Sequence, residues 1–124
     1  MSKEDERNLL EETTAVLERN LERVNVMWVG SADGKYAITW QQFCLMAASV
    51  VYDSGFGAQE IAKDLIVVGP DWWLERHEYD GSEGWVFKRM PTRLVDPVPL
   101  PFSNVAGGMW NDISEMNEVE SCQT

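Results

Sequence analysis

The chain has few of the side chains on which enzymes and metal sites depend. Its 124 residues include one histidine, His77, and two cysteines, Cys44 and Cys122, which form neither a CxxC pair nor a Cys/His cluster. It also has no nucleophile elbow, P-loop, HExxH or GxGxxG motif. We therefore expect a protein that is not an enzyme and that uses no cofactor and no metal.

Positive charge is scarce as well. Ten Lys and Arg oppose 21 Asp and Glu, which gives a formal net charge of −11, and no basic residue follows Arg93. Free nucleic acid and anionic membranes attract cationic proteins, so neither is an expected partner. Long-range attraction favours a basic protein partner instead. Plain solubility is the alternative explanation of this charge.

Long apolar runs are missing. No stretch approaches the roughly 18 residues that a membrane-spanning helix needs, and the first residues, 1–6, are charged rather than apolar like a signal peptide. With two isolated cysteines, this composition predicts a soluble protein of a reducing cytoplasm.

Helical patterns come first along the chain. Residues 3–23 predict an amphipathic helix with acids in its first turn and arginines in its last. Its apolar seam, spaced 4-3-4-3, packs either on the domain's own sheet or on a second copy, so a homodimer remains open. A second helix is predicted over residues 40–52, capped by Thr39, and a short third one over 58–63. The two seams consist of Leu10, Thr14, Leu17, Leu21 and Val24, and of Trp40, Phe43, Cys44, Ala47, Ala48 and Val51.

Strand patterns alternate with these helices. Residues 25–29 and 35–38 flank an Asp-Gly turn and predict a hairpin. Residues 65–68 form an apolar strand, and residues 72–79 and 85–89 flank the turn at 80–84. Two hairpin-linked pairs predict an α+β domain, residues 1–90, in which helices cover one face of an antiparallel sheet. Residues 91–124 are predicted to form an extended arm, because prolines recur at every second position from Pro97, and then an acidic tail. The tail forms either a weak helix over 109–119 or nothing stable.

Adjacent tryptophans begin the longest strand. Neighbouring side chains on a strand point to opposite faces, so a single core can bury only one of Trp72 and Trp73. The other lies against a second layer of the chain, against a partner, or over a stacked base with Arg76 or Lys88 nearby. One face is predicted to hold Trp72, Leu74, Arg76 and Glu78, and the other Trp73, Glu75, His77 and Tyr79. This placement separates His77 from Glu78, which argues for a structural histidine rather than a general base or metal ligand.

The segment from Ile38 to Lys88 resembles small phage and prophage proteins of uncharacterised function from Firmicutes. The resemblance is carried by Tyr52-Asp53-Ser54-Gly55-Phe56-Gly57 and by Trp72-Trp73-Leu74-Glu75-Arg76-His77-Glu78-Tyr79-Asp80-Gly81-Ser82-Glu83. This chain has Gly84-Trp85 where a second aromatic pair is expected, so its packing there can differ. The resemblance implies a phage context but transfers no catalytic or ligand role.

Small acidic phage proteins often inhibit host defence nucleases. We therefore expect an inhibitory binding protein, such as an anti-CRISPR factor, that occupies a basic nucleic-acid channel of a host effector with carboxylates. The alternatives are a sponge for a small nucleotide, with Trp73 or Tyr79 stacking beside Arg76, and an accessory phage protein. The expected acidic contacts are Glu4, Asp5, Glu11, Glu12, Glu18, Glu22, Asp112, Glu115 and Glu118, and the aromatic and charged contacts are Trp73, Glu75, Arg76, His77 and Tyr79.

Overall fold

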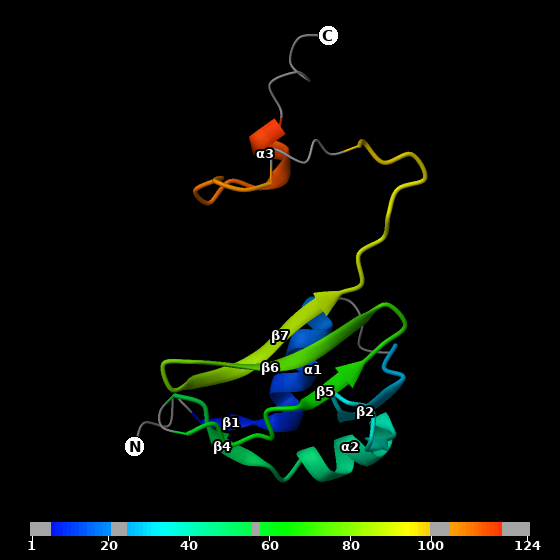
Figure 1. Ribbon diagram of the computed structural model, residues 1–124. Coiled ribbons are helices and arrows are strands. Elements are labelled where there is room, and N and C mark those ends of the chain that lie inside the picture. The colour runs from blue at the N-terminus through cyan, green and yellow to red at the C-terminus, as the bar shows by residue number, and fades with distance from the viewer. Residues whose placement is uncertain (1–5, 21–24, 56–57, 100–104, 118–124) are drawn as a thin grey trace. The chain divides into compact units, whose positions relative to one another are not determined.

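The computed structural model describes residues 6–20, 25–55, 58–99 and 105–117, and the chain divides into two compact units, Met1–Pro91 and Thr92–Thr124. The first unit is α+β (Figure 1). Its elements are β1 (Glu6–Asn8), α1 (Leu9–Arg19), β2 (Trp28–Ser31), β3 (Ala37–Ile38), α2 (Trp40–Ala47), β4 (Val51–Asp53), β5 (Leu65–Val68), β6 (Trp72–Tyr79) and β7 (Ser82–Arg89).

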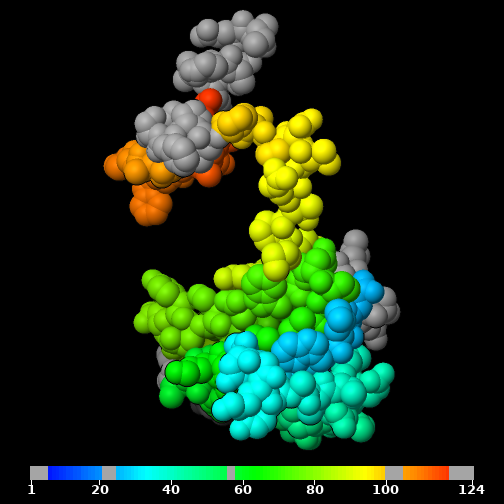
Figure 2. All heavy atoms as spheres, turned by 45° about the vertical axis from the view of Figure 1, so that its right-hand side comes forward, coloured from blue at the N-terminus to red at the C-terminus, as the bar shows by residue number. Residues whose placement is uncertain are grey.

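A five-stranded sheet organises the first unit. Its strand order is β3-β2-β5-β6-β7 and every neighbouring pair is antiparallel, which confirms the predicted α+β class with an antiparallel sheet. The strand at 65–68, the strand at 72–79 and the β2–β3 hairpin are confirmed as well. In the space-filling view the blue and cyan atoms of this hairpin adjoin the teal atoms of α2 (Figure 2).

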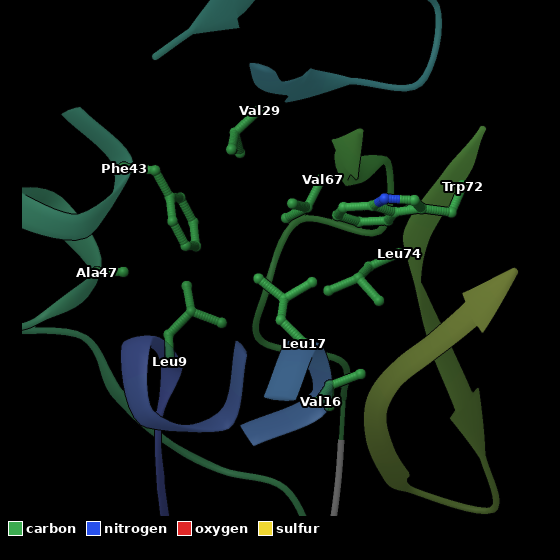
Figure 3. Close-up of a cluster of buried hydrophobic side chains, with 9 residues drawn as sticks. All are labelled: Leu9, Val16, Leu17, Val29, Phe43, Ala47, Val67, Trp72 and Leu74. Carbon is green, nitrogen blue, oxygen red and sulfur yellow. The ribbon is translucent and has the colours of Figure 1, made fainter. Parts of the chain in front are cut away.

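The core joins helices and sheet. Buried side chains of α1 and α2 meet those of β2, β5 and β6, with Leu17, Val29, Phe43, Val67 and Leu74 fully buried (Figure 3). Burial of this apolar surface is the main favourable term in folding. The remaining members of the cluster are Leu9, Val16, Ala47 and Trp72.

The first helix is shorter than predicted. Residues 6–8 pair with β4 as β1 instead of joining the helix, and Asn8 caps α1 by accepting the Glu11 N–H at 3.0 Å. Residues 3–5 and 21–23 lie outside the described residues. The buried stripe consists of Leu9, Thr13, Val16 and Leu17. Of the predicted seam, Leu17 is buried and Leu10 and Thr14 are partly buried, while Leu21 and Val24 lie outside the described residues.

The second helix begins as predicted and ends early. Thr39 caps it in a capping box with Gln42, but the helix stops at Ala47 and residues 51–53 form β4. Its partner strand β1 lies more than 40 residues earlier, which no local periodicity reveals. Along the predicted stripe, Phe43 and Ala47 are buried while Val51 is exposed.

Residues 58–63 form no helix. The backbone N–H groups of Glu60 and Ile61 donate to the Glu83 carboxylate, at 2.6 and 3.4 Å, instead of to helical carbonyls. The predicted five-residue turn after β6 is also wrong, because β7 begins at Ser82 and only Asp80 and Gly81 turn the chain. Both have positive φ, 54° and 85°, as the tight turns that match strand twist require.

The second unit has one short helix among its described residues, 92–99 and 105–117. It is α3 (Ile113–Asn117), which begins later than the predicted helix over 109–119, whose last two residues lie outside the described part of the chain. Residues 92–99 form neither helix nor strand. Trp110 is fully exposed at a φ of 81°.

Candidate binding surface

A buried arginine ties together four elements of the first unit. The side chain of Arg76 on β6 is fully buried, and its Nη2 donates to Glu83 Oε2 on β7 at 2.8 Å and to the Tyr52 hydroxyl on β4 at 2.9 Å. Its Nη1 lies 3.5 Å from Glu12 Oε1 on α1. The guanidinium also lies over the rings of Tyr52 and Trp85, 5.5 and 4.6 Å from their centroids. These contacts fix the far end of the β6–β7 hairpin against α1 and β4.

The protonation states around Arg76 are held by this cluster. Burial and the hydrogen bond that the Tyr52 hydroxyl donates to Glu12, at 2.6 Å, raise the pKa of Tyr52 above its ordinary value. Burial alone would lower the pKa of Arg76, but hydrogen bonds to Tyr52 and Glu83 raise it. Tyr52 therefore stays neutral and Arg76 stays charged at physiological pH.

The expected role of Arg76 as an exposed contact is corrected by this burial. Arg76 points to the core face with Trp72 and Leu74, whereas Trp73 points to the opposite face. It therefore cannot stack beside Trp73 on a bound base. Glu12, expected as an acidic contact, is half-buried and pairs with Arg76 instead.

The other acidic contacts expected on α1 and in the tail have basic or capping neighbours where they fall among the described residues. Glu11 and Glu18 are exposed on α1, but Arg7 and Arg19 line the same groove as Glu11. In the second unit, Asp112 and Glu115 cap α3 by accepting each other's backbone N–H, at 2.8 and 2.9 Å. The expected contacts Glu4, Asp5, Glu22 and Glu118 lie outside the described residues.

A different set of carboxylates gathers at one end of the first unit, which we call the acidic end. Glu6 of β1 is the strand partner of Asp53 of β4, and the Asp53 N–H donates to Glu60 Oε2 at 3.3 Å. Glu60 in turn donates its N–H to Glu83, which is the strand partner of Glu78. Figure 1 shows β1, β4 and the β6–β7 turn at this same end. The acidic end consists of Glu6, Asp53, Glu60, Glu78 and Asp80. Asp53 is partly buried and the other four side chains are exposed.

The acidic end adjoins the face of the sheet that points away from the core, which we call the outer face. Here β6 presents Trp73, Glu75, His77 and Tyr79, as its alternation predicts. Trp73 Nε1 donates to Glu75 Oε1 at 2.8 Å, and Glu75 Oε2 lies 3.2 Å from Lys88 Nζ. The hydrogen bond from Trp73 has the largest effect on Glu75 and lowers its pKa, and the contact with Lys88 lowers it further. Tyr79, next to the turn, is 76% exposed.

No family model, curated protein or solved structure matches this chain. The surface is therefore interpreted from its own chemistry. Within the described ranges, no group of three or more His, Cys, Asp and Glu side chains could hold a metal ion, so the carboxylates of the acidic end do not converge on one point. No described helix has the length and apolar character needed to cross a membrane.

Sequence patterns did not identify Asp53 and Glu60 as surface acids of one site. The patterns predict Asp53 just after a helix over 40–52 and Glu60 within a helix over 58–63. In the structure Asp53 lies on β4, and Glu60 lies beside the β6–β7 hairpin because Glu83 accepts its backbone N–H. No local pattern in the sequence indicates that Glu83 contacts the backbone at Glu60.

A hollow of about 590 Å³ lies on the outer face. Its lining includes Ile66 and Val68 of β5, Trp73 and Glu75 of β6, and Lys63. Lys63 lines this hollow together with Asp64 and Glu75, so its charges are mixed around an apolar floor, which suits a side chain of a partner better than a nucleotide phosphate.

Proposed function

We propose that this chain is a non-enzymatic inhibitory binding protein of phage type that acts in the cytoplasm of a bacterial host. Its acidic end occupies a basic nucleic-acid-binding channel of a host effector, as an anti-CRISPR or similar anti-defence factor would. The observation that supports this proposal is the gathering at one end of the domain of exposed carboxylates from β1, the loop before β5 and the β6–β7 turn, beside the partly buried Asp53 of β4.

Charge complementarity gives the acidic end its expected partner. A channel that binds nucleic acid presents Lys and Arg at the spacing of phosphates, and carboxylates can replace those phosphates. Arg76 does not cancel this charge, because its guanidinium is buried and binds Glu12 and Glu83 behind the surface. We infer further that α1 and α2 cover one face of the sheet, which leaves the outer face for the same partner.

Rigidity and an aromatic anchor strengthen the proposal. Acids on a fixed hairpin lose less conformational entropy on binding than acids on a flexible tail. The two-residue turn at Asp80-Gly81 and the hydrogen bond from the Gly81 N–H to Glu78 Oε2, 2.7 Å long, fix the tip. Exposed Tyr79 lies next to this turn, and exposed tyrosines are enriched among the residues that dominate protein interfaces.

The test measures binding of the purified full chain to a panel of CRISPR effector nucleases and other host nucleases, at low and at high salt, with and without competing nucleic acid. We expect one effector to bind at low salt, to bind more weakly at high salt because exposed charges are screened, and to be displaced by its own nucleic acid. Failure of every effector to bind at low salt would contradict the proposal, and would favour an accessory phage protein instead.

A matched pair of variants assigns the binding to the acidic end. Glu78→Gln with Asp80→Asn removes two charges there and keeps the hydrogen-bond acceptors, while Asp71→Asn with Asp96→Asn removes two exposed charges elsewhere. Exposed ion pairs contribute about 0.2–1 kcal/mol each, so the first variant should bind about 2- to 30-fold more weakly. The second should bind like the parent. Equal losses in both variants would show that net charge, and not the acidic end, drives association.

A further inference from the structure

An unusual turn precedes α3 in the second unit. Gly107, Met109 and Trp110 all have positive φ, at 76°, 49° and 81°. Glycine adopts this left-handed conformation freely, but a residue with a Cβ atom is crowded there by the following carbonyl oxygen. Met109 and Trp110 are therefore strained in succession. Such strain persists only where surrounding contacts hold it, and it is concentrated at functional sites.

Contacts within the second unit hold this turn. The Asn111 N–H donates to the Gly108 carbonyl at 2.9 Å, and the Met116 N–H donates to the Asp112 carbonyl at 3.1 Å as α3 begins. Gly108 lies against the side chain of Met116, because a Cβ atom added at Gly108 would be 2.6 Å from Met116 Sδ. Met116 is partly buried, so it fills the inner side of the turn.

The outer side of the turn presents apolar side chains. Trp110 is 100% exposed and Met109 is 83% exposed, so neither gains the burial that stabilises a fold. Val105 and Ile113, just before and after the turn, are more than half exposed as well. Exposed apolar side chains that occur together mark interaction surfaces more often than single ones do. We call residues 107–112 the tryptophan turn.

The charges near the tryptophan turn indicate the kind of partner. Asp112 and Glu115 are exposed and are held in place because each accepts the backbone N–H of the other. Residues 94–124 contain no Lys or Arg. An exposed tryptophan beside fixed carboxylates fits a pocket of a protein with an apolar floor and a rim of Lys or Arg. A second copy of this chain, with a net charge of −11, would be repelled instead.

We propose that Trp110 is a second anchor on the same effector nuclease, and that it inserts into an apolar pocket rimmed by basic side chains. This inference rests on the proposed function, because it needs the same partner. The strained turn holds Trp110 outward before binding, so less conformational entropy is lost on association. Two contacts on one chain also bind more tightly together than either does alone. The chain from Arg89 to Gly107 can span at most about 60 Å, so the pocket lies within that distance of the end of β7.

Binding of the full chain to the effector that binds the parent tests the second anchor. Trp110→Ala should bind at least about 30-fold more weakly, as truncation of a dominant interface residue does, and Trp110→Phe should recover part of the loss. Val98→Ala is the matched control, because it shortens another side chain of the second unit that is 89% exposed. It should bind like the parent.

The same assay separates this inference from the proposed function. If Trp110→Ala bound like the parent while Glu78→Gln with Asp80→Asn bound more weakly, the second anchor would be overturned and the proposed function would stand. If no effector bound the parent, both would be wrong. A loss for Val98→Ala as large as that for Trp110→Ala would also overturn the anchor, because it would assign binding to the apolar character of the whole unit.

A measurement on the free chain tests whether Trp110 is available to a partner. Trp110→Ala should unfold at the same urea concentration as the parent, as followed by far-UV circular dichroism, because the side chain is fully exposed. A clearly lower concentration would mean that Trp110 packs within the chain, and would overturn the inference.

A charge-neutral variant tests the basic rim. Asp112→Asn with Glu115→Gln removes two charges beside Trp110 and keeps the oxygen atoms that cap α3. It should bind the effector about 2- to 30-fold more weakly at low salt, and the difference should shrink at high salt. Binding equal to that of the parent at low salt would refute a pocket with a basic rim.

Discussion

Replacing Arg76 by methionine should destabilise the first unit strongly. Methionine fills part of the space of the alkyl chain but leaves Glu83, whose side chain is 2% exposed, and Glu12, 13% exposed, without their cation. Removing one partner of a buried ion pair costs about 3–5 kcal/mol. The free energy of unfolding of a domain is about 5–15 kcal/mol, so the variant should unfold at much lower urea concentration, as followed by far-UV circular dichroism.

A double-mutant cycle separates this ion pair from general damage to the core. Glu83→Gln keeps one oxygen that can accept a backbone N–H of Glu60 or Ile61, removes the charge and replaces the second acceptor by an NH2 donor. If Arg76 and Glu83 interact as the geometry indicates, the double variant should lose less stability than the sum of the single losses, by about 0.5–3 kcal/mol. A loss below about 1 kcal/mol for Arg76→Met, or strict additivity, would refute the reasoning.

Two further variants probe single contacts. Gly69→Ala should destabilise by about 1–3 kcal/mol in the same urea assay, because its Cβ would lie 2.0 Å from the buried ring of Trp72. Trp73→Phe removes the first cause of the lowered pKa of Glu75, so that pKa should rise toward its ordinary value of 4.5, as followed by NMR of the carboxyl carbon. Ionised Glu75 stabilises the folded chain, because its pKa is lower in the folded than in the unfolded state. This contribution to the free energy of unfolding should be present above pH 4.5 and should be lost as the pH falls below it.

Local patterns predicted the parts of the fold that local physics determines. The alternation of residues 72–79 predicted β6 and its two faces, and Thr39 followed by Gln42 has the spacing of a capping box, which the structure contains. Both depend on neighbours within a few residues. The same is true of the Asp-Gly turn between β2 and β3, where the Asp33 carboxylate accepts the Lys35 N–H at 2.9 Å.

Contacts between distant segments could not be predicted in this way. The β1–β4 pairing joins residues 6–8 to residues 51–53, and nothing in either short segment names the other. The alternation of side chains along β6 places Arg76 on the same face as Trp72 and Leu74, which indicates that it is buried. The sequence does not reveal the partners that a buried arginine needs, because Tyr52, Glu12 and Glu83 come from three other elements.

The Tyr52 hydroxyl offers a way to separate stability from binding. It donates to Glu12 at 2.6 Å and accepts from Arg76 at 2.9 Å, behind the acidic end rather than on it. Tyr52→Phe leaves both partners short of a hydrogen bond and should cost about 1–3 kcal/mol of stability. Because the surface carboxylates remain in place, a folded Tyr52→Phe protein should bind a nuclease partner as tightly as the parent does. Glu78→Gln with Asp80→Asn should show the opposite pattern, with unchanged unfolding and weaker binding. If Tyr52→Phe instead weakened binding as much as the surface variant while the protein remained folded, the buried cluster would have to open onto the partner, and the acidic end alone would not account for recognition.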